Sequence, residues 1–316
     1  MTAVSDIYPA GQIVLREVGL RDGLQMVKTH PSTSDKKEWI RREYDAGVRC
    51  FELGSFLPAH RYPQFADILE LIEFLKELPG THGSALALNR KGGDAAVNSG
   101  VAEVTAVLSA SEAHSKANIN RTQDQAIGEI EFLVDLARSA SHKPLVSVGI
   151  AMAFGCSISG DVKVDTVLSL AERCLNAGAD VISLADTVGY AGPTDVATLC
   201  KEFQNAFPNR VFGIHLHDTR GLGLANAIAA LQNGATIIDG AMAGLGGCPF
   251  APNATGNIVF EDLVFLCQKE DIYTGIEIEQ LLGVRDVVQK SMPQEALYGS
   301  IAKAGLPQPT ELDANK

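Results

Sequence analysis

Short apolar runs alternate with longer amphipathic segments along the chain from residue 13 onward. The apolar runs are rich in β-branched residues, and they begin at Ile13, Val48, His82, Glu103, Leu145, Asp180, Val211 and Thr236. We interpret them as eight strands. In the segments between them, among which are 34–47, 164–178 and 222–234, apolar residues recur with the period of an α-helix. Such alternation is typical of parallel strands joined by helices.

A TIM (β/α)8 barrel closes with eight strand–helix repeats, and we predict this α/β fold. An open doubly wound sheet also alternates strands with helices, so the repeat count alone does not decide. The polar residues favour the barrel, because barrel enzymes build their sites at the carboxyl ends of the strands. Residues suited to chemistry lie at those ends, namely Arg21, Asp22, Asp186, His215 and His217. We assign 13–275 to one catalytic barrel domain and 276–316 to a short C-terminal helical extension and tail.

The composition excludes several classes of protein. The 316 residues include 26 Lys and Arg against 38 Asp and Glu, a net charge of −12, which argues against a nucleic-acid partner. Apolar residues make up 46% and charged residues 20%, as in an ordinary globular protein. The six cysteines are widely spaced and form no CxxC pair, so we expect reduced thiols. The chain shows neither a signal-peptide pattern nor an apolar run of membrane-spanning length, which predicts a cytoplasmic protein with no membrane partner.

The strongest local motif is His215-Leu216-His217-Asp218 at the end of the seventh predicted strand. Residues two apart in a strand point to the same face, so both imidazoles can reach one metal ion. The alternative is that the two histidines only form hydrogen bonds at the strand end, and the motif alone leaves both interpretations open.

A second motif, Arg21-Asp22-Gly23, follows the first predicted strand. An aspartate there offers a hard oxygen ligand, and the neighbouring guanidinium can bind a carboxylate or enolate oxygen through two nitrogens. Taken alone, the motif is better explained as a salt-bridged turn. Glu52, in the second strand, needs a cation when it is buried, and Arg21 is its natural partner.

The third motif is the glycine-rich segment 244–257, which has the character of a lid and carries the thiol of Cys248. Most lone cysteines only fill apolar space, but the glycine-rich setting argues against that here. Asn257 is either a helix cap or an amide-oxygen metal ligand. The polar segment 114–118 after the fourth strand is expected to be a solvated loop. Dinucleotide chemistry is disfavoured, because no strand is followed by Gly-x-Gly-x-x-Gly.

In this order, the three motifs resemble the 3-hydroxy-3-methylglutaryl-CoA (HMG-CoA) lyase family of the DRE-TIM metallolyases. The matching stretches are Glu17–Gln25, Phe51–Phe56, Ile182–Gly189, His215–Thr219 and Ala243–Asn257. The resemblance runs from about residue 13 to residue 300 and implies a pyruvate carboxyltransferase-like TIM barrel. It also implies a divalent cation, Mg²⁺ or Mn²⁺, held by Asp22, His215, His217 and Asn257.

The reaction implied by the resemblance is a retro-Claisen cleavage of a small-molecule acyl-CoA, as in leucine degradation and ketone-body formation. A 3-hydroxy-3-alkylglutaryl-CoA gives acetyl-CoA and a 3-keto acid such as acetoacetate. The resemblance assigns enolate stabilisation to Arg21, oriented by Glu52, and proton removal to Asp22 or His215. Cys248 would protonate the acetyl-CoA carbanion. The implied substrate-binding residues are Arg21, Gln25, Ser55, Ser183, Asp186 and Thr187, and the implied assembly is a homodimer.

The chain departs from the family pattern at several positions. Leu20 replaces the usual proline, and Leu216 replaces the usual cysteine between the histidines; both changes spare the predicted ligands. Larger departures lie in 58–61, in 155–160 and at Arg220, where the family usually has tyrosine. Because these loops are expected near the barrel mouth, the reaction type can persist while the acyl group differs.

Three other functions compete with the lyase. A Claisen-condensing synthase of the isopropylmalate or homocitrate type shares the barrel and the two histidines. It typically reads RDGEQ where this chain has 21–25, and it often carries a further C-terminal domain. The other two are a catalytically silent metal-binding barrel and an amidohydrolase barrel, whose histidine pair normally lies on the first strand.

Overall fold

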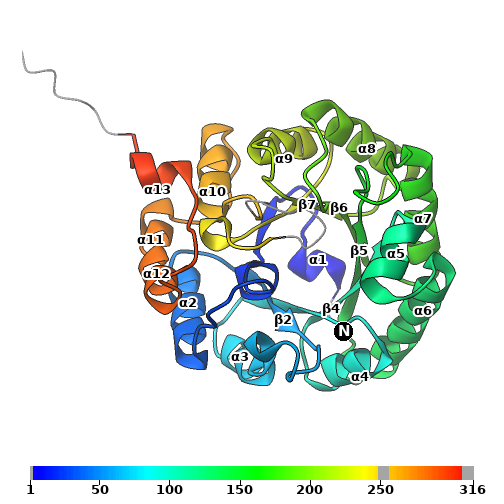
Figure 1. Cartoon of the computed structure of the whole chain (residues 1–316), viewed down its shortest axis with the longest axis horizontal. Coiled ribbons are helices and arrows are strands. Elements are labelled where there is room, and N and C mark those ends of the chain that lie inside the picture. The colour runs from blue at the N-terminus through cyan, green and yellow to red at the C-terminus, as the bar shows by residue number, and fades with distance from the viewer. Residues whose placement is uncertain (1–2, 248–255, 308–316) are drawn as a thin grey trace, which may run out of the picture.

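The computed structural model describes residues 3–247 and 256–307. Eight parallel strands form a closed barrel in which each strand pairs with the next and the eighth pairs with the first (Figure 1). The strands are β1 Val14–Glu17, β2 Cys50–Ser55, β3 His82–Leu86, β4 Glu103–Ser109, β5 Leu145–Ala151, β6 Val181–Asp186, β7 Phe212–Leu216 and β8 Ile237–Gly240. All eight predicted strands are confirmed, and the fold is a TIM barrel.

Helices surround the barrel (Figure 1). Those between β1 and β8 are α2 Thr33–Asp45, α3 Ile68–Lys76, α4 Arg90–Asn98, α5 Glu112–Ile119, α6 Gln123–Ser139, α7 Val164–Asn176, α8 Pro193–Ala206 and α9 Gly223–Gln232. The predicted helix at 34–47 corresponds to α2, whose start is fixed by a capping box between Ser32 and Asp35. The predictions at 164–178 and 222–234 match α7 and α9 within two residues.

The strands are apolar because both of their faces are covered. On β5, Val146, Val148 and Ile150 are fully buried in the layer between barrel and helices. The alternate residues of β5 face the barrel interior, where the Ser147 hydroxyl lies 3.0 Å from that of Thr105 on β4. Polar and small residues therefore collect inside the barrel, while the apolar core fills the surrounding shell.

A short N-terminal helix, α1 Val4–Ile7, covers the amino-terminal end of the barrel; Figure 1 shows it in the centre of the ring. The next residue, Tyr8, packs against Leu145, Val181 and Ile237, which lie at the amino-terminal ends of their strands. The sequence pattern did not predict this helix. Its position leaves the carboxyl ends of the strands as the site-bearing face.

The chain continues after β8 with α10 Phe260–Lys269, α11 Ile278–Leu282, α12 Arg285–Ser291 and α13 Ser300–Ala304. Helices α11 and α12 pack on α2, and α13 packs on α10. The backbones meet closely at Gly47, since a Cβ there would lie 2.1 Å from the Gly275 oxygen. The C-terminal helices are thus part of the helical shell. None of the described helices has the length and apolar character that a membrane crossing requires.

Candidate active site

A single π-helical turn, η1 Gly19–Gly23, follows β1 and carries Arg21 and Asp22. The turn is fixed by Glu17, the last residue of β1. Its Oε1 accepts hydrogen bonds from the backbone nitrogens of Gly19, at 2.8 Å, and Met242, at 2.9 Å. Because Met242 follows β8, one buried carboxyl group joins the segments that leave β1 and β8.

Asp22, His215 and His217 bring their ligand atoms within 4.8 Å of one another. The two Nε2 atoms lie 3.1 Å apart, and Asp22 Oδ2 lies 3.8 Å from Nε2 of His215 and 3.7 Å from Nε2 of His217. All three residues are buried or nearly so. Two imidazole nitrogens and a carboxylate oxygen converging on one point form a donor set suited to a divalent cation.

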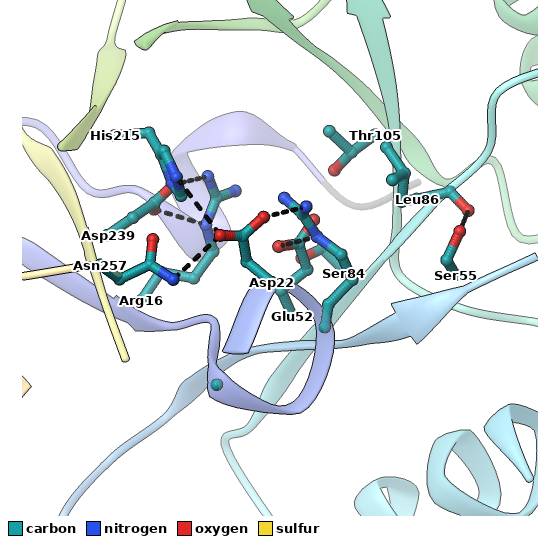
Figure 2. A network of polar contacts seen from close by, with 12 residues as sticks. Arg16, Asp22, Glu52, Ser55, Ser84, Leu86, Thr105, His215, Asp239 and Asn257 are labelled. Atoms are coloured by element: carbon teal, nitrogen blue, oxygen red, sulfur yellow. Dashed lines mark hydrogen bonds and ion pairs between the residues drawn. The ribbon is translucent and has the colours of Figure 1, made fainter. Parts of the chain in front are cut away.

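Asn257 completes this arrangement. Its Nδ2 donates to Asp22 Oδ2 and to the Leu245 oxygen, both at 2.9 Å, and Figure 2 shows it beside Asp22. Its Oδ1 is buried and has no hydrogen-bond partner among the described residues. A buried acceptor without a partner is costly, so this oxygen fits a fourth metal ligand. Asn257 is not a helix cap, because α10 begins at Phe260 with Val259 as its N-cap.

The charge states of the three residues also suit a metal ion. Burial opposes the charge of Asp22, but Arg21 and the two histidines hold the pKa of that carboxyl well below its usual range. Burial and the neighbouring His215 lower the pKa of His217 to about 4, so its ring is neutral at pH 7. Burial lowers the pKa of His215, yet its hydrogen bond to Asp239 and the charge of Asp22 outweigh burial and raise it.

Two charged residues behind His215 were not predicted from the sequence. Asp239 Oδ2 lies 3.0 Å from His215 Nδ1, and Asp239 in turn accepts two hydrogen bonds from Arg16, at 2.8 and 2.9 Å (Figure 2). Despite burial, Arg16 and His215 lower the pKa of Asp239 to about 2. A carboxylate on Nδ1 leaves the lone pair on Nε2 directed at the metal position. The available signal was the presence of charged residues in two short, mainly buried strands, Arg16 and Glu17 in β1 and Asp239 in β8.

Arg21 lies between two carboxylates. Its Nε donates to Glu52 Oε2 at 2.7 Å, and its Nη1 donates to Asp22 Oδ1. Burial disfavours the guanidinium charge, but Glu52 and Asp22 raise the pKa of Arg21. The side chain is thus a fixed cation beside the Asp22 and histidine cluster, and the predicted pairing of Arg21 with Glu52 is confirmed.

A pocket at the carboxyl ends of the strands contains this cluster and about 960 Å³ of atom-free space, including the part open to solvent. The predicted site residues that line it are Arg21, Asp22, Gln25, Glu52, Ser183, Thr187, His215 and His217. Ser55 and Asp186 lie outside its lining. The Ser55 hydroxyl donates to the Leu86 oxygen at 3.2 Å, and Asp186 accepts from two backbone nitrogens of the turn after β6. Cys248 lies outside the described residues.

The expectation of a solvated loop at 114–118 is wrong. These residues belong to α5, and His114 and Asn118 line the pocket. The helix begins there because the Ser111 hydroxyl accepts a hydrogen bond from the His114 nitrogen at 3.2 Å. The serine before Glu112 was the signal for this helix in the sequence.

The family model described as HMGL-like matches residues 12–288. The chain is 33% identical over 285 residues to hydroxymethylglutaryl-CoA lyase of Bacillus subtilis, covering 90% of this chain and 94% of that protein. It is 36% identical over 306 residues to (R)-citramalyl-CoA lyase of Chloroflexus aurantiacus, covering 93% and 95%. An HMG-CoA lyase of A. baumannii, solved in complex with coenzyme A and 3-methylmalate, aligns with a TM-score of 0.86 at 34% identity, covering 98% of this chain and 100% of that one.

Proposed function

Because the chain belongs to the HMGL-like family and is an HMG-CoA lyase-like carbon–carbon lyase, we propose that it cleaves a 3-hydroxy-3-alkylglutaryl-CoA by a retro-Claisen reaction. HMG-CoA or a related thioester is the substrate, and the products are acetyl-CoA and acetoacetate or another 3-keto acid. The observation that carries this proposal is the meeting of Asp22, His215 and His217 beside the Arg21 guanidinium in one pocket.

A divalent cation, Mg²⁺ or Mn²⁺, is the proposed cofactor. Asp22, His215, His217 and the unpartnered Oδ1 of Asn257 would hold it. Mixed oxygen and nitrogen donors suit such an ion, although the same set also accepts zinc. When bound, the cation polarises substrate oxygens and makes a contacted hydroxyl group more acidic.

The remaining chemistry belongs to side chains of the pocket. Asp22 or His215 removes the proton of the tertiary hydroxyl group, and the bond between that carbon and the carbon next to the thioester breaks. Its electron pair passes to the thioester, whose enolate charge is offset by Arg21, a type of stabilisation worth about 3–4 kcal/mol. Glu52 holds Arg21 in place through its 2.7 Å hydrogen bond. We assign protonation of the resulting carbanion to Cys248.

The coenzyme A part of the substrate is proposed by analogy with the relative solved with coenzyme A. We assign contacts with the acyl group to Gln25, Ser183 and Thr187, and their position in the pocket lining supports this assignment. For Ser55 and Asp186 only the family resemblance supports substrate binding. We further propose that residues 13–275 form the catalytic domain. We also propose that the protein is a homodimer, and light scattering would test this by measuring its molecular mass in solution.

The deciding experiment offers the protein a panel of thioesters in the presence of Mg²⁺ or Mn²⁺ and follows acetyl-CoA by mass spectrometry. The panel contains several 3-hydroxy-3-alkylglutaryl-CoA compounds and (R)-citramalyl-CoA. Release of acetyl-CoA that stops on addition of a chelator is the expected result. Consumption of acetyl-CoA with a 2-keto acid, without cleavage of any thioester, would instead identify a condensing synthase. If (R)-citramalyl-CoA were the only compound cleaved, the substrate would be a citramalyl thioester and not a 3-hydroxy-3-alkylglutaryl thioester.

A further inference from the structure

One glycine of the barrel wall has no packing reason to be a glycine. Among the described strands, five glycines occur, and a Cβ atom added to four of them would meet another atom within 3.3 Å, namely at Gly54, Gly83, Gly213 and Gly240. At the fifth, Gly149, the nearest atom is the Ala106 oxygen at 3.9 Å, an ordinary contact distance. Its φ is not positive either. Glycine within a strand weakens the strand and often marks the close approach of a ligand.

Gly149 lines the candidate active-site pocket from the wall opposite Arg21. In the closed order of eight strands, β5 is four positions from β1 in either direction, so the two strands face each other across the barrel. The pocket residues on β3 to β6 are uncharged, namely Leu86, Thr105, Val107, Gly149, Ala151, Ser183 and Ala185. The pocket therefore has a charged half, which includes the metal ligands, and an uncharged half.

A polar side chain stands beside Gly149. Ser183 on β6 is in register with Gly149 on β5, which is in register with Val107 on β4. Ser183 lines the pocket and is only 7% exposed, and its hydroxyl oxygen is buried without a hydrogen-bond partner among the described residues. A buried hydroxyl group without a partner indicates that a ligand oxygen belongs there. Ser183 thus gives this wall one polar group, and Gly149, one strand further and about 4.8 Å away, leaves space that no side chain fills.

The carbon that bears the tertiary hydroxyl group carries four substituents. In the proposed reaction the hydroxyl and carboxylate arms face the metal ligands, and the thioester arm faces Arg21. The alkyl substituent is the one group left for the opposite wall. We propose that Gly149 is a specificity-determining residue, opening the pocket to a C3 alkyl group larger than methyl. The substrate class is then a 3-hydroxy-3-alkylglutaryl thioester with an ethyl or longer apolar substituent. This inference rests on the proposed function.

The test compares the 3-methyl, 3-ethyl and 3-isobutyl members of the 3-hydroxy-3-alkylglutaryl-CoA series with Mn²⁺ present. Wild-type protein should cleave the ethyl or isobutyl compound with a kcat/KM at least equal to that for the methyl compound. Gly149→Ala and Gly149→Val should lower the ratio of isobutyl to methyl kcat/KM by about tenfold or more, because one or more methylenes lose their space. Gly128→Ala is the matched control, since a Cβ at this α6 position meets nothing within 4 Å and lies outside the pocket lining.

Each other outcome overturns the inference. If the wild-type protein prefers the methyl compound, the pocket is not adapted to a larger alkyl group. If the ratio of isobutyl to methyl kcat/KM is unchanged in folded Gly149→Ala and Gly149→Val, Gly149 does not determine selectivity. Thermal melting checks the fold, and the alanine variant remains decisive when the valine variant is unstable. Failure of wild-type protein to cleave any member of the series is a different result, because it overturns the proposed function and this inference with it.

Discussion

Asp239 Oδ2 lies 3.0 Å from His215 Nδ1, although 24 residues separate them in the chain. His215 is therefore held by a carboxylate on one nitrogen while its other nitrogen faces Asp22 and His217. Asp239 is itself held by Arg16, whose Nη1 also reaches Glu103 at 3.4 Å. The orientation of the His215 ring thus depends on charged residues in the interior of the barrel.

We expect Asp239→Asn to weaken Mn²⁺ binding by about 10- to 100-fold, because the amide cannot hold His215 in the same tautomer. Calorimetric titration of the purified variant with Mn²⁺ measures this change. Asp45→Asn, at an exposed position of α2, is the control and should bind Mn²⁺ as the wild type does. Unchanged affinity in a folded Asp239→Asn protein would mean that His215 is oriented by other groups.

Arg21→Met should lower kcat by about 100-fold or more while the protein still folds, since the fixed cation opposite the developing enolate is lost. Steady-state assays of thioester cleavage give kcat, and circular dichroism reports the fold. Arg173→Met removes a partly exposed arginine that forms a salt bridge with exposed Asp124 and lies outside the pocket lining, so it should leave kcat unchanged. Near-normal turnover of Arg21→Met would remove this side chain from the mechanism.

The buried carboxyl of Glu17 should make stability depend on pH. Burial raises the pKa of Glu17 to about 8, against hydrogen bonds from Met242 and Gly19 that lower it, whereas an unfolded glutamate has a pKa of about 4.3. Between these values the folded state holds a proton that the unfolded state has lost. The free energy of unfolding therefore falls as pH rises, by at most about 1.4 kcal/mol per pH unit for this group, and the loss is complete above pH 8.

Glu17→Gln keeps an oxygen that accepts from the two backbone donors but has no ionisable proton. It should therefore reduce the slope of the free energy of unfolding against pH. Urea denaturation at a series of pH values from 5 to 9 measures the difference. Glu70→Gln changes a carboxyl whose side chain is 63% exposed and should leave the slope as it is. Equal slopes in Glu17→Gln and wild type would show that Glu17 is ionised throughout.

Tyr8→Phe should lower the free energy of unfolding by about 1.5–3 kcal/mol, the range for hydrogen bonds to charged groups. The Tyr8 hydroxyl donates to buried Glu103 Oε2 at 2.7 Å, and phenylalanine keeps the ring but not this bond. Denaturant unfolding measures the loss, and Tyr273→Phe, at a residue 90% exposed, is the neutral control. A smaller loss of stability would mean that His82, 2.9 Å from the same oxygen, and Arg16 satisfy Glu103 without the tyrosine hydroxyl.

The fold was predictable from local patterns, whereas the meeting of Asp22 with His215 and His217 was implied by the family resemblance, because each motif alone left other interpretations open. Strands of a barrel are apolar on their outer face, and the residues that end them must share one rim. Once the strands of 14–17 and 212–216 are recognised, Asp22 and the two histidines are expected at the same rim, but the rim alone does not bring them together. The same local logic placed Arg21 beside Glu52.

The rest depends on contacts that only the closed barrel defines. Arg16 and Asp239 are 223 residues apart and meet because β1 and β8 pair in a register that puts them side by side. Asn257 resembles a cap, since an asparagine stands shortly before a helix, but its side chain donates to Asp22, which a backbone bridge to His217 brings within reach. Gly149 is one strand glycine among several until the space around each is known.

The pairing of β1 with β8 also has a consequence for biosynthesis. During translation the first strand leaves the ribosome long before its last partner, since Arg16 precedes Asp239 by 223 residues. A nascent chain therefore exposes an open sheet edge, a state prone to aggregation, until the eighth strand emerges. Because Asp22 follows β1 and Asn257 follows β8, their hydrogen bond can form only after the last strand has been made. Nascent chains that stop short of residue 257 therefore lack the amide group that donates to Asp22 Oδ2.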